Sequence, residues 1–297
     1  MRILIAIPHY FGAGPEGFPS ESTKPAAKRV RQNALAMVLT GLHQHFGADR
    51  YGLDHGAARV VRAASPATHH LDIIVCTAGK SHLLGELPAL RPLYTHIERE
   101  VDPLLLGFEC HKLLAERRGQ YDYYAYVEDD VLVSDPSFFA KRRVFDKLFG
   151  PHALLQPNRY EASLTGPARK LYVDYHLGEH VTKPHQDLND TPSLAMPYLD
   201  EIIRFERTTY PSAGSFFLNA TQLAFWADGP FFLDGDHSYL SVLDAAATLS
   251  VMKSFRIYKP VLEQAWFLEV SHVSPRWIED VNARMGKAAE QPERRRA

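Results

Sequence analysis

Short, mostly apolar runs constrain the fold of this chain more than any other feature of the sequence. The runs cover residues 3–7, 71–77 and 123–127, and they are rich in β-branched or aromatic side chains. A strand that is apolar on both faces is typical of a parallel sheet covered by helices on both sides. The runs therefore predict three buried strands of one sheet.

Two segments between these runs have the spacing of helices. Ala34, Val38 and Leu42 recur every four residues, which places them on one face of a helix. A second segment follows Asp102 and Pro103, residue types that cap a helix and open its first turn. Its apolar residues at helical spacing are Leu106, Cys110, Leu113 and Leu114. Alternating strands and helices predict an α/β fold with a mixed, mainly parallel sheet flanked by helices.

The sequence shows no internal repeat, and its length allows one large α/β domain or two smaller ones. We expect the stretch 161–197 to be loop-like, because it shows no clear periodicity. Residues 286–297 are polar, lack periodicity and end in arginines, so we expect a disordered tail. A solvated tail is favoured over one that binds anionic lipid or nucleic acid.

Charge and cysteine content limit the partners and the compartment. With 33 Lys and Arg against 35 Asp and Glu, the formal net charge is −2, so we expect no nucleic-acid partner. Cys76 and Cys110 cannot form a disulfide framework, which favours a reducing compartment. No apolar run approaches the roughly 20 residues that span a bilayer. We therefore expect a cytoplasmic protein, with peripheral contact to a membrane left open.

Polar residues follow two of the predicted strands. Pro8, His9 and Tyr10 come after the first run, and the consecutive acidic residues 128–130 come after the third. Sheets of this kind bind ligands outside the carboxyl ends of their strands. Neighbouring carboxylates repel one another unless a cation compensates them, and carboxylate oxygens suit Mg²⁺ or Mn²⁺ bound together with a diphosphate. The alternative is an acidic surface turn that carries no chemistry.

The segment YDYYAYVEDDVLVSDPSFF (121–139) resembles the metal-binding strand of GT-A glycosyltransferases, which carry a DxD-type motif after a hydrophobic strand. It is similar to the EDD variant of the N-acetylglucosaminyltransferases that act on N-glycans. The resemblance implies that Asp130 binds the metal directly, and that Glu128 and Asp129 orient the sugar and the ribose. Residues 5–10, which include Pro8, His9 and Tyr10, match the first nucleotide-binding loop of that family by position.

The resemblance also implies a fold and a function for the whole chain. We expect a Rossmann-like GT-A catalytic domain with a nucleotide-binding half (1–135) and an acceptor-binding half (136–285). The implied activity is metal-dependent transfer of a sugar from a nucleotide-sugar, most simply a UDP-sugar, to a glycan or another hydroxyl acceptor. The implied cofactor is Mn²⁺ or Mg²⁺. In the family, a loop similar to Gly214 and Ser215 lies against the donor sugar and the acceptor, although Gly214 could equally form a turn or bulge.

Asp244 is the candidate for a catalytic base. It lies near the start of a predicted helix, where the family carries an acidic residue, although the Glu-Asp pair of the family is absent. A base is needed only if the reaction inverts configuration at the sugar. The alternative role is structural, because Ser241 and Asp244 also have the spacing of a capping box. Asp234 and Asp236 are rival acids.

His272 matches a histidine that GT-A enzymes use as a further metal ligand near the end of the catalytic domain. An imidazole ligand would favour Mn²⁺ over Mg²⁺. The alternative is a histidine that is hydrogen-bonded only locally. His176, His180 and His185 have spacings of four and five residues, but their segment contains no cysteine, so we expect no zinc site.

Two other classes of function stay open. A nucleotidyltransferase can share the nucleotide-binding half and the acidic metal ligands, and residues 12–15 weakly resemble its glycine-rich signature. A sugar- or nucleotide-binding module could keep the same fold without turnover. The sequence does not identify the donor sugar, the acceptor, the stereochemical outcome or the oligomeric state.

Overall fold

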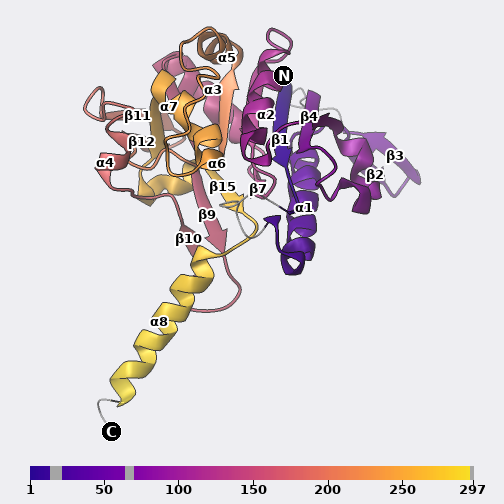
Figure 1. Cartoon of the computed structure of the whole chain (residues 1–297). Helices are drawn as coiled ribbons and strands as arrows, with labels where there is room; N and C mark the ends of the chain where they lie inside the picture. The colour runs from indigo at the N-terminus through magenta and orange to yellow at the C-terminus, as the bar shows by residue number, and fades with distance from the viewer. Residues whose placement is uncertain (14–21, 64–69, 295–297) are drawn as a thin grey trace.

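The structure, a computed structural model, describes residues 1–13, 22–63 and 70–294, with side chains described as far as residue 286. Its centre is a sheet with the strand order β13-β6-β1-β4-β5 (Figure 1). The strands β1, β4, β5 and β6 are parallel, and β13 joins the edge beside β6 in the antiparallel direction. The predicted mixed, mainly parallel sheet is confirmed. The bounds are β1 (Arg2–His9), β4 (His70–Ala78), β5 (Thr95–Arg99), β6 (Tyr123–Val127) and β13 (Ser215–Asn219).

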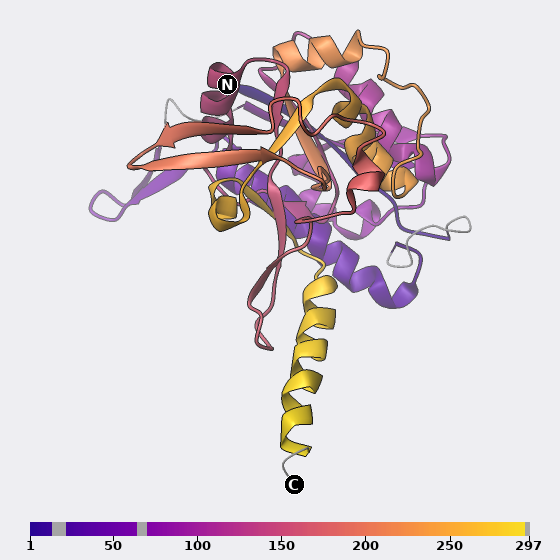
Figure 2. The ribbon, with the colours of Figure 1, turned by 90° about the vertical axis from the view of Figure 1, so that its left-hand side faces the viewer.

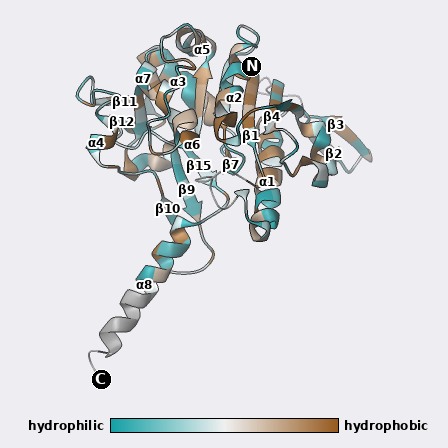
Figure 3. Ribbon diagram, in the orientation of Figure 1, coloured by the Kyte–Doolittle hydropathy of each residue, from teal (hydrophilic) through white to brown (hydrophobic). Residues whose placement is uncertain are grey.

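Helices cover both faces of this sheet. Successive residues of a strand point to opposite faces, so β1 contributes Ile3, Ile5 and Ile7 to one core and Leu4 and Ala6 to another. The first core also holds apolar residues of α1 (Lys28–Phe46) and α3 (Phe138–Phe149), and the second holds those of α2 (Leu106–Ala115) and α5 (Ala220–Ala227). Figure 3 shows the hydrophobic colours concentrated on the central strands. The predicted flanking helices are confirmed.

The second half of the chain, together with β7 from the end of the first half, forms two four-stranded sheets with the orders β10-β9-β15-β7 and β11-β12-β14-β8. Their strands are β7 (Val131–Leu132), β8 (Ala153–Leu155), β9 (Asn158–Ala162), β10 (Lys170–Tyr172), β11 (Ser193–Tyr198), β12 (Glu201–Arg207), β14 (Arg256–Pro260) and β15 (Glu269–His272). In the first half, β2 (Tyr51–Asp54) and β3 (Arg59–Arg62) pair as a separate two-stranded hairpin outside the central sheet. The remaining helices are α4 (Glu179–Thr182), α6 (Val242–Asp244), α7 (Ser250–Ser254) and α8 (Trp277–Arg294).

Short helical turns complete the fold, and one of them confirms a predicted cap. The 3-10 turns are η2 (Pro25–Ala27), η3 (Leu84–Glu86), η4 (Pro88–Leu93), η5 (Pro103–Leu105) and η7 (Leu262–Phe267), and a π-helical turn, η6 (Ala245–Leu249), follows α6. The side chain of Asp102 accepts a hydrogen bond from the backbone N–H of Leu104 at 2.9 Å. Asp102 therefore caps the turn that leads into α2, as its position before Pro103 predicts.

The structure differs from the sequence-based expectation in two segments. The stretch 161–197 is not simply a loop, because it contains β10, α4 and the start of β11, each too short to show a period. Residues 286–294, which fall in the predicted disordered tail, continue α8, and residues 295–297 lie outside the described part. Ala, Glu and Lys are good helix formers, so they extend a helix that starts in the preceding segment. Figures 1 and 2 show α8 projecting away from the rest of the molecule.

Within the described residues, none of the helices is long and apolar enough to cross a membrane.

A buried histidine ties α2 to the turn η6. His111 is fully buried, and its Nε2 lies 2.8 Å from the backbone oxygen of Ala246, to which it donates. Aromatic rings of Tyr126, Phe216 and Trp226 surround the imidazole. Burial lowers the pKa of His111 to about 4. The hydrogen bond to Ala246 raises this pKa, but its effect is smaller than that of burial.

We expect His111 to make the fold sensitive to mild acid. The unfolded chain binds a proton at the ordinary histidine pKa of about 6.5, whereas the folded chain does not until about pH 4, so stability falls as the pH drops between these values. At pH 4.5 the loss amounts to about 2–3 kcal/mol. Urea unfolding at pH 7 and pH 4.5 measures it. His111→Gln keeps a donor for Ala246 and should lose less stability between the two pH values than the wild type; an identical loss would contradict the assignment.

Candidate functional site

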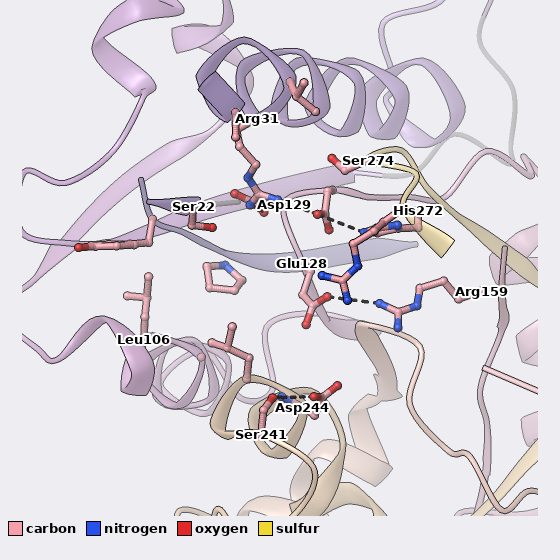
Figure 4. Close-up of a pocket in the computed structure, with 18 of the residues that line it drawn as sticks. Ser22, Arg31, Leu106, Glu128, Asp129, Arg159, Ser241, Asp244, His272 and Ser274 are labelled. Carbon is pink, nitrogen blue, oxygen red and sulfur yellow. Dashed lines mark hydrogen bonds and ion pairs between the residues drawn. The ribbon is translucent and has the colours of Figure 1, made fainter. Parts of the chain in front are cut away.

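A cavity of about 530 Å³ opens at the carboxyl ends of β1 and β6 (Figure 4). The two strands are parallel and in register through Ala6 and Tyr126, so the residues that follow each strand emerge at the same edge of the sheet. The cavity also receives residues from the second half of the chain. Of the candidate site residues, those that line it are Pro8, Tyr10, Glu128, Asp129, Asp130, Asp244 and His272. The others, His9, Gly214 and Ser215, lie behind its wall.

Asp129 and Asp130 share one cation from α1. The guanidinium of Arg31 donates through Nη1 to Asp130 Oδ2 at 2.6 Å and through Nη2 to Asp129. Both carboxylates and Arg31 are less than a tenth exposed. Burial alone would raise the pKa of Asp130, but Arg31 and His272 outweigh it and hold this pKa well below its usual value. The repulsion between the two aspartates is therefore compensated within the protein itself.

His9 supports Asp129 from beneath rather than lining the cavity. Its Nε2 accepts a hydrogen bond from the backbone N–H of Leu83 at 3.1 Å, so the ring proton of the neutral imidazole is on Nδ1. Nδ1 lies 2.5 Å from Asp129 Oδ2 and donates to it. His9 is fully buried, which leaves it a positioning role for Asp129 in this arrangement.

His272 is held between Asp130 and a buried carboxylate. Its Nδ1 donates to Glu161 Oε1 at 2.8 Å, and its Nε2 lies 3.4 Å from Asp130 Oδ2. Glu161 is fully buried and also accepts the backbone N–H groups of Arg276 and Ile278, at 3.0 and 2.8 Å, beside the start of α8. Burial lowers the pKa of His272, but the bonds to the two carboxylates raise it to about 9.

The residues present fit a divalent ion that is bound partly by the protein and partly by a ligand. Asp130 and His272 come from different segments of the chain and converge. Glu161 accepts a hydrogen bond from Nδ1 of His272, as carboxylates do for metal-binding histidines. Among the described residues, no group of three or more His, Cys, Asp or Glu side chains could hold a metal ion. The protein would therefore supply two ligands, and water and diphosphate oxygens would supply the others.

Glu128 lies next to a rigid ion pair. Arg159 on β9 donates through Nε and Nη2 to both oxygens of Asp174, at 2.8 and 2.9 Å, and its Nη1 lies 3.7 Å from Glu128 Oε2. Loss of solvent raises the pKa of Glu128 to about 8, although Arg159 acts in the opposite direction. Glu128 therefore holds a proton more readily than an exposed glutamate does.

Gly214 holds Glu128 in place through its backbone. It has a φ of +59°, and its carbonyl accepts the backbone N–H of Glu128 at 2.9 Å. A Cβ at this position would lie 2.5 Å from Glu128 Oε2 and 2.9 Å from Val131 Cγ2. The neighbouring Ser215 is fully buried and donates to the carbonyl of Ala213 at 3.2 Å. Gly214 thus forms a bend with a left-handed backbone, and its loop lies next to Glu128.

We expect Gly214→Ala to disturb both the fold and the site. A left-handed backbone costs an alanine about 1 kcal/mol, and the clash with Glu128 raises the total to about 2–4 kcal/mol. Gly119→Ala is the matched control, because Gly119 has a φ of +79° but no atom within 4 Å of an added Cβ. Urea unfolding compares the stabilities, and calorimetry with UDP compares the site. Equal losses of stability in the two variants would show that glycine is needed at position 214 only for its left-handed backbone and not for its close contact with Glu128.

Asp244 faces the cavity and also takes part in a helix cap. Ser241 precedes α6, its hydroxyl accepts the backbone N–H of Asp244 at 3.1 Å, and it donates to Asp244 Oδ2 at 2.6 Å. Burial raises the pKa of Asp244, against the effect of the Ser241 hydroxyl. The rivals Asp234 and Asp236 both bind Lys253, at 2.9 and 2.5 Å, and neither lines the cavity.

Two of the three histidines that were weighed for a zinc site make separate local contacts. His176 Nδ1 lies 3.1 Å from the Thr209 hydroxyl, and the His185 ring contacts Tyr239. Of residues 12–15, which weakly resemble a nucleotidyltransferase signature, Gly14 and Pro15 lie outside the described residues.

Four residues of the site were missed by sequence reasoning: Arg31, Arg159, Glu161 and Asp174. The only local signal was for Arg31, which belongs to a basic segment immediately before the apolar part of α1. The others stand on or near β9 and β10, in the region whose short strands show no periodicity.

A scan against protein-family profiles gives no match, and a search of curated protein sequences gives none. Comparison with solved structures finds partial likenesses to glycosyltransferases. Residues 1–349 of S. aureus TarS in complex with UDP match with a TM-score of 0.42 at 9% identity, over 87% of this chain and 57% of that chain. GalNAc-T7 with UDP, GalNAc and Mn²⁺ matches with a TM-score of 0.46 at 10% identity, over 91% of this chain and 43% of that chain.

Mouse xyloside xylosyltransferase 1, in its apo form, matches with a TM-score of 0.40 at 12% identity, over 92% of this chain and 97% of that chain. The chain thus spans less than two thirds of the TarS and GalNAc-T7 chains that it resembles. Because these scores are low, the description of the fold as mixed α/β rests on its own strand order and pairing.

Proposed function

We propose that this protein is a GT-A glycosyltransferase that moves a sugar from a nucleotide-sugar, most simply UDP-linked, to a hydroxyl of a glycan or another acceptor. The observation that carries the proposal is the convergence of Asp130 and His272 in a cavity beside Pro8 and Tyr10. The resemblance of residues 121–139 to the metal-binding strand of that family supports it. A divalent ion held by Asp130 and His272, preferably Mn²⁺, would supply positive charge to neutralise the departing diphosphate.

The side chains around the cavity would orient the donor. Pro8 and Tyr10 would contact the nucleotide at the end of β1, while Glu128 and Asp129 would hydrogen-bond the sugar and the ribose. Asp129 is fixed for this role by His9 and Arg31. Positioned donors and acceptors contribute to catalysis because they need no reorganisation during the reaction.

Asp244 would act on the acceptor. Figure 4 shows Asp244 across the cavity from Asp129, with Glu128 between them. In the transfer, the acceptor oxygen bonds to the anomeric carbon while the bond from that carbon to the diphosphate breaks. If configuration inverts, the hydroxyl proton passes to the Asp244 carboxylate. A carboxylate whose pKa is raised by burial is suited to that role near neutral pH.

The experiment that tests the proposal is a donor screen that measures released nucleotide. The protein is incubated with a panel of UDP-sugars, Mn²⁺ and candidate acceptors, and free UDP is measured with and without acceptor. Release of UDP with transfer of the sugar is the expected result. Pyrophosphate formed from a nucleoside triphosphate and a sugar phosphate would indicate a nucleotidyltransferase instead. Metal-dependent binding of UDP without turnover of any donor would indicate a binding module.

A further inference from the structure

Arg31 donates to the same carboxylate oxygen that faces His272. Arg31 Nη1 lies 2.6 Å from Asp130 Oδ2, and His272 Nε2 lies 3.4 Å from that same atom. A divalent ion that bridged Asp130 and His272 would bind this oxygen, because the oxygen is the point where the two side chains meet. The ion and the guanidinium therefore compete for one atom.

The charge on the pair of aspartates leads to the same conclusion. Asp129 and Asp130 carry two negative charges, and Arg31 contacts both carboxylates, so the three side chains together carry one negative charge. A guanidinium within a few ångströms repels a second cation strongly at a site that water screens poorly. With Arg31 in this position, the free protein should bind a divalent ion weakly.

Arg31 is attached only through the end of its side chain. Its Nε is buried and makes no hydrogen bond to any described residue. By contrast, Arg159 is fixed through Nε as well as Nη2 on Asp174. Arg31 stands in the first turns of α1, which begins without a capping side chain and has no acidic residue in its first turn. The two aspartates are thus the contacts that hold the guanidinium where it is.

Arg31 lines the cavity in which the diphosphate of a donor would lie. A guanidinium matches phosphate oxygens with two parallel hydrogen bonds, as it matches a carboxylate. We propose that Arg31 is a latch with two positions. In the free protein it binds both Asp129 and Asp130 and blocks the metal site. When a divalent ion and the donor bind together, it releases Asp130 and binds the diphosphate instead. This inference rests on the proposed function, and it makes binding of the ion and binding of the nucleotide interdependent.

Opposite changes in two affinities would identify the latch. Mn²⁺ binding is measured from the electron paramagnetic resonance signal of the free ion without nucleotide, and UDP binding is measured by calorimetry with Mn²⁺ present. We expect Arg31→Gln to bind Mn²⁺ alone about tenfold more tightly than the wild type, because a competing positive charge is gone. We expect the same variant to bind UDP about tenfold more weakly, because the diphosphate loses a charged partner. A purely structural role would weaken both.

Two further variants keep the test decisive. Arg29→Gln removes an exposed arginine from the same turn of α1 and should change neither affinity. Arg31→Lys keeps the charge but reaches one carboxylate at a time, so it should show the same two opposite changes at a smaller size; it replaces Arg31→Gln if that variant fails to fold. If the wild type binds UDP with Mn²⁺ and transfers sugar, but the changes are absent or share one sign, the latch is wrong and the proposed function stands. If the wild type neither binds UDP with Mn²⁺ nor turns over a donor, both are overturned.

Discussion

Replacement of Asp130 by asparagine should reduce sugar transfer about a thousandfold and remove the effect of Mn²⁺ on UDP binding. Asp130 is the one member of the acidic triplet that faces His272, so it is the residue through which the proposed ion would be held. Asparagine has nearly the same shape but lacks the charge that a hard divalent ion prefers. A loss of this size corresponds to removal of a major electrostatic stabilisation of the transition state. Initial rates of UDP release and calorimetry with and without Mn²⁺ measure the two effects.

Asp228→Asn provides the control for the Asp130 experiment. Asp228 forms an exposed ion pair with Arg118 at 2.6 Å, remote from the cavity lining, and exposed pairs contribute little to stability. This variant should keep full activity and full metal dependence. If Asp130→Asn binds UDP as well as the wild type does, and responds equally to Mn²⁺, then Asp130 is not the residue that holds the ion.

Asp244→Asn should lower the turnover number about a hundredfold to ten-thousandfold while UDP affinity changes little. These factors are typical of the loss of a general base, and the prediction applies to a reaction that inverts configuration. The amide of asparagine still reaches the Ser241 hydroxyl, so the cap at the start of α6 is retained. The melting temperature should therefore stay close to that of the wild type. Steady-state kinetics with saturating donor, together with thermal unfolding, measure the two properties.

Ser241→Ala separates the cap from the base. Removal of the Ser241 hydroxyl leaves the Asp244 backbone N–H without this acceptor, which costs about 1 kcal/mol of stability. The carboxylate of Asp244 remains, so turnover should be reduced far less than in Asp244→Asn. If instead Asp244→Asn keeps its turnover and loses stability as Ser241→Ala does, Asp244 is a capping residue and the base lies elsewhere.

The fold could be predicted where each strand carries its own signal. Residues 3–7, 71–77 and 123–127 fall inside β1, β4 and β6, because a strand buried on both faces must be apolar throughout. The same reasoning places the residues after β1 and β6 at one edge of the sheet, which is where the cavity lies. By contrast, β12 contains several charged residues and was not predicted, since its burial depends on partners that the local sequence does not show.

The partners of the acidic triplet could not be predicted in this way. Arg31 and Asp130 are 99 positions apart, and His272 and Glu161 are 111 positions apart. Nothing near Glu161 marks it as a buried carboxylate, because its burial results from the packing of β9 against β15 and from the start of α8. Local patterns thus placed several polar residues at one edge of the sheet, while the contacts that fix their charge and orientation arise only from the assembled fold.

The antiparallel pairing of β13 with β6 makes the two sequence halves inseparable. A fragment that stopped at residue 135 would keep the acidic triplet but lose the strand that covers the outer edge of β6. The exposed backbone amides and carbonyls of that apolar edge would then be free to recruit a strand from another molecule. Such a fragment should precipitate or form mixed oligomers rather than remain a monomer that binds nucleotide. Truncation is therefore a poor way to study the two halves of this protein separately.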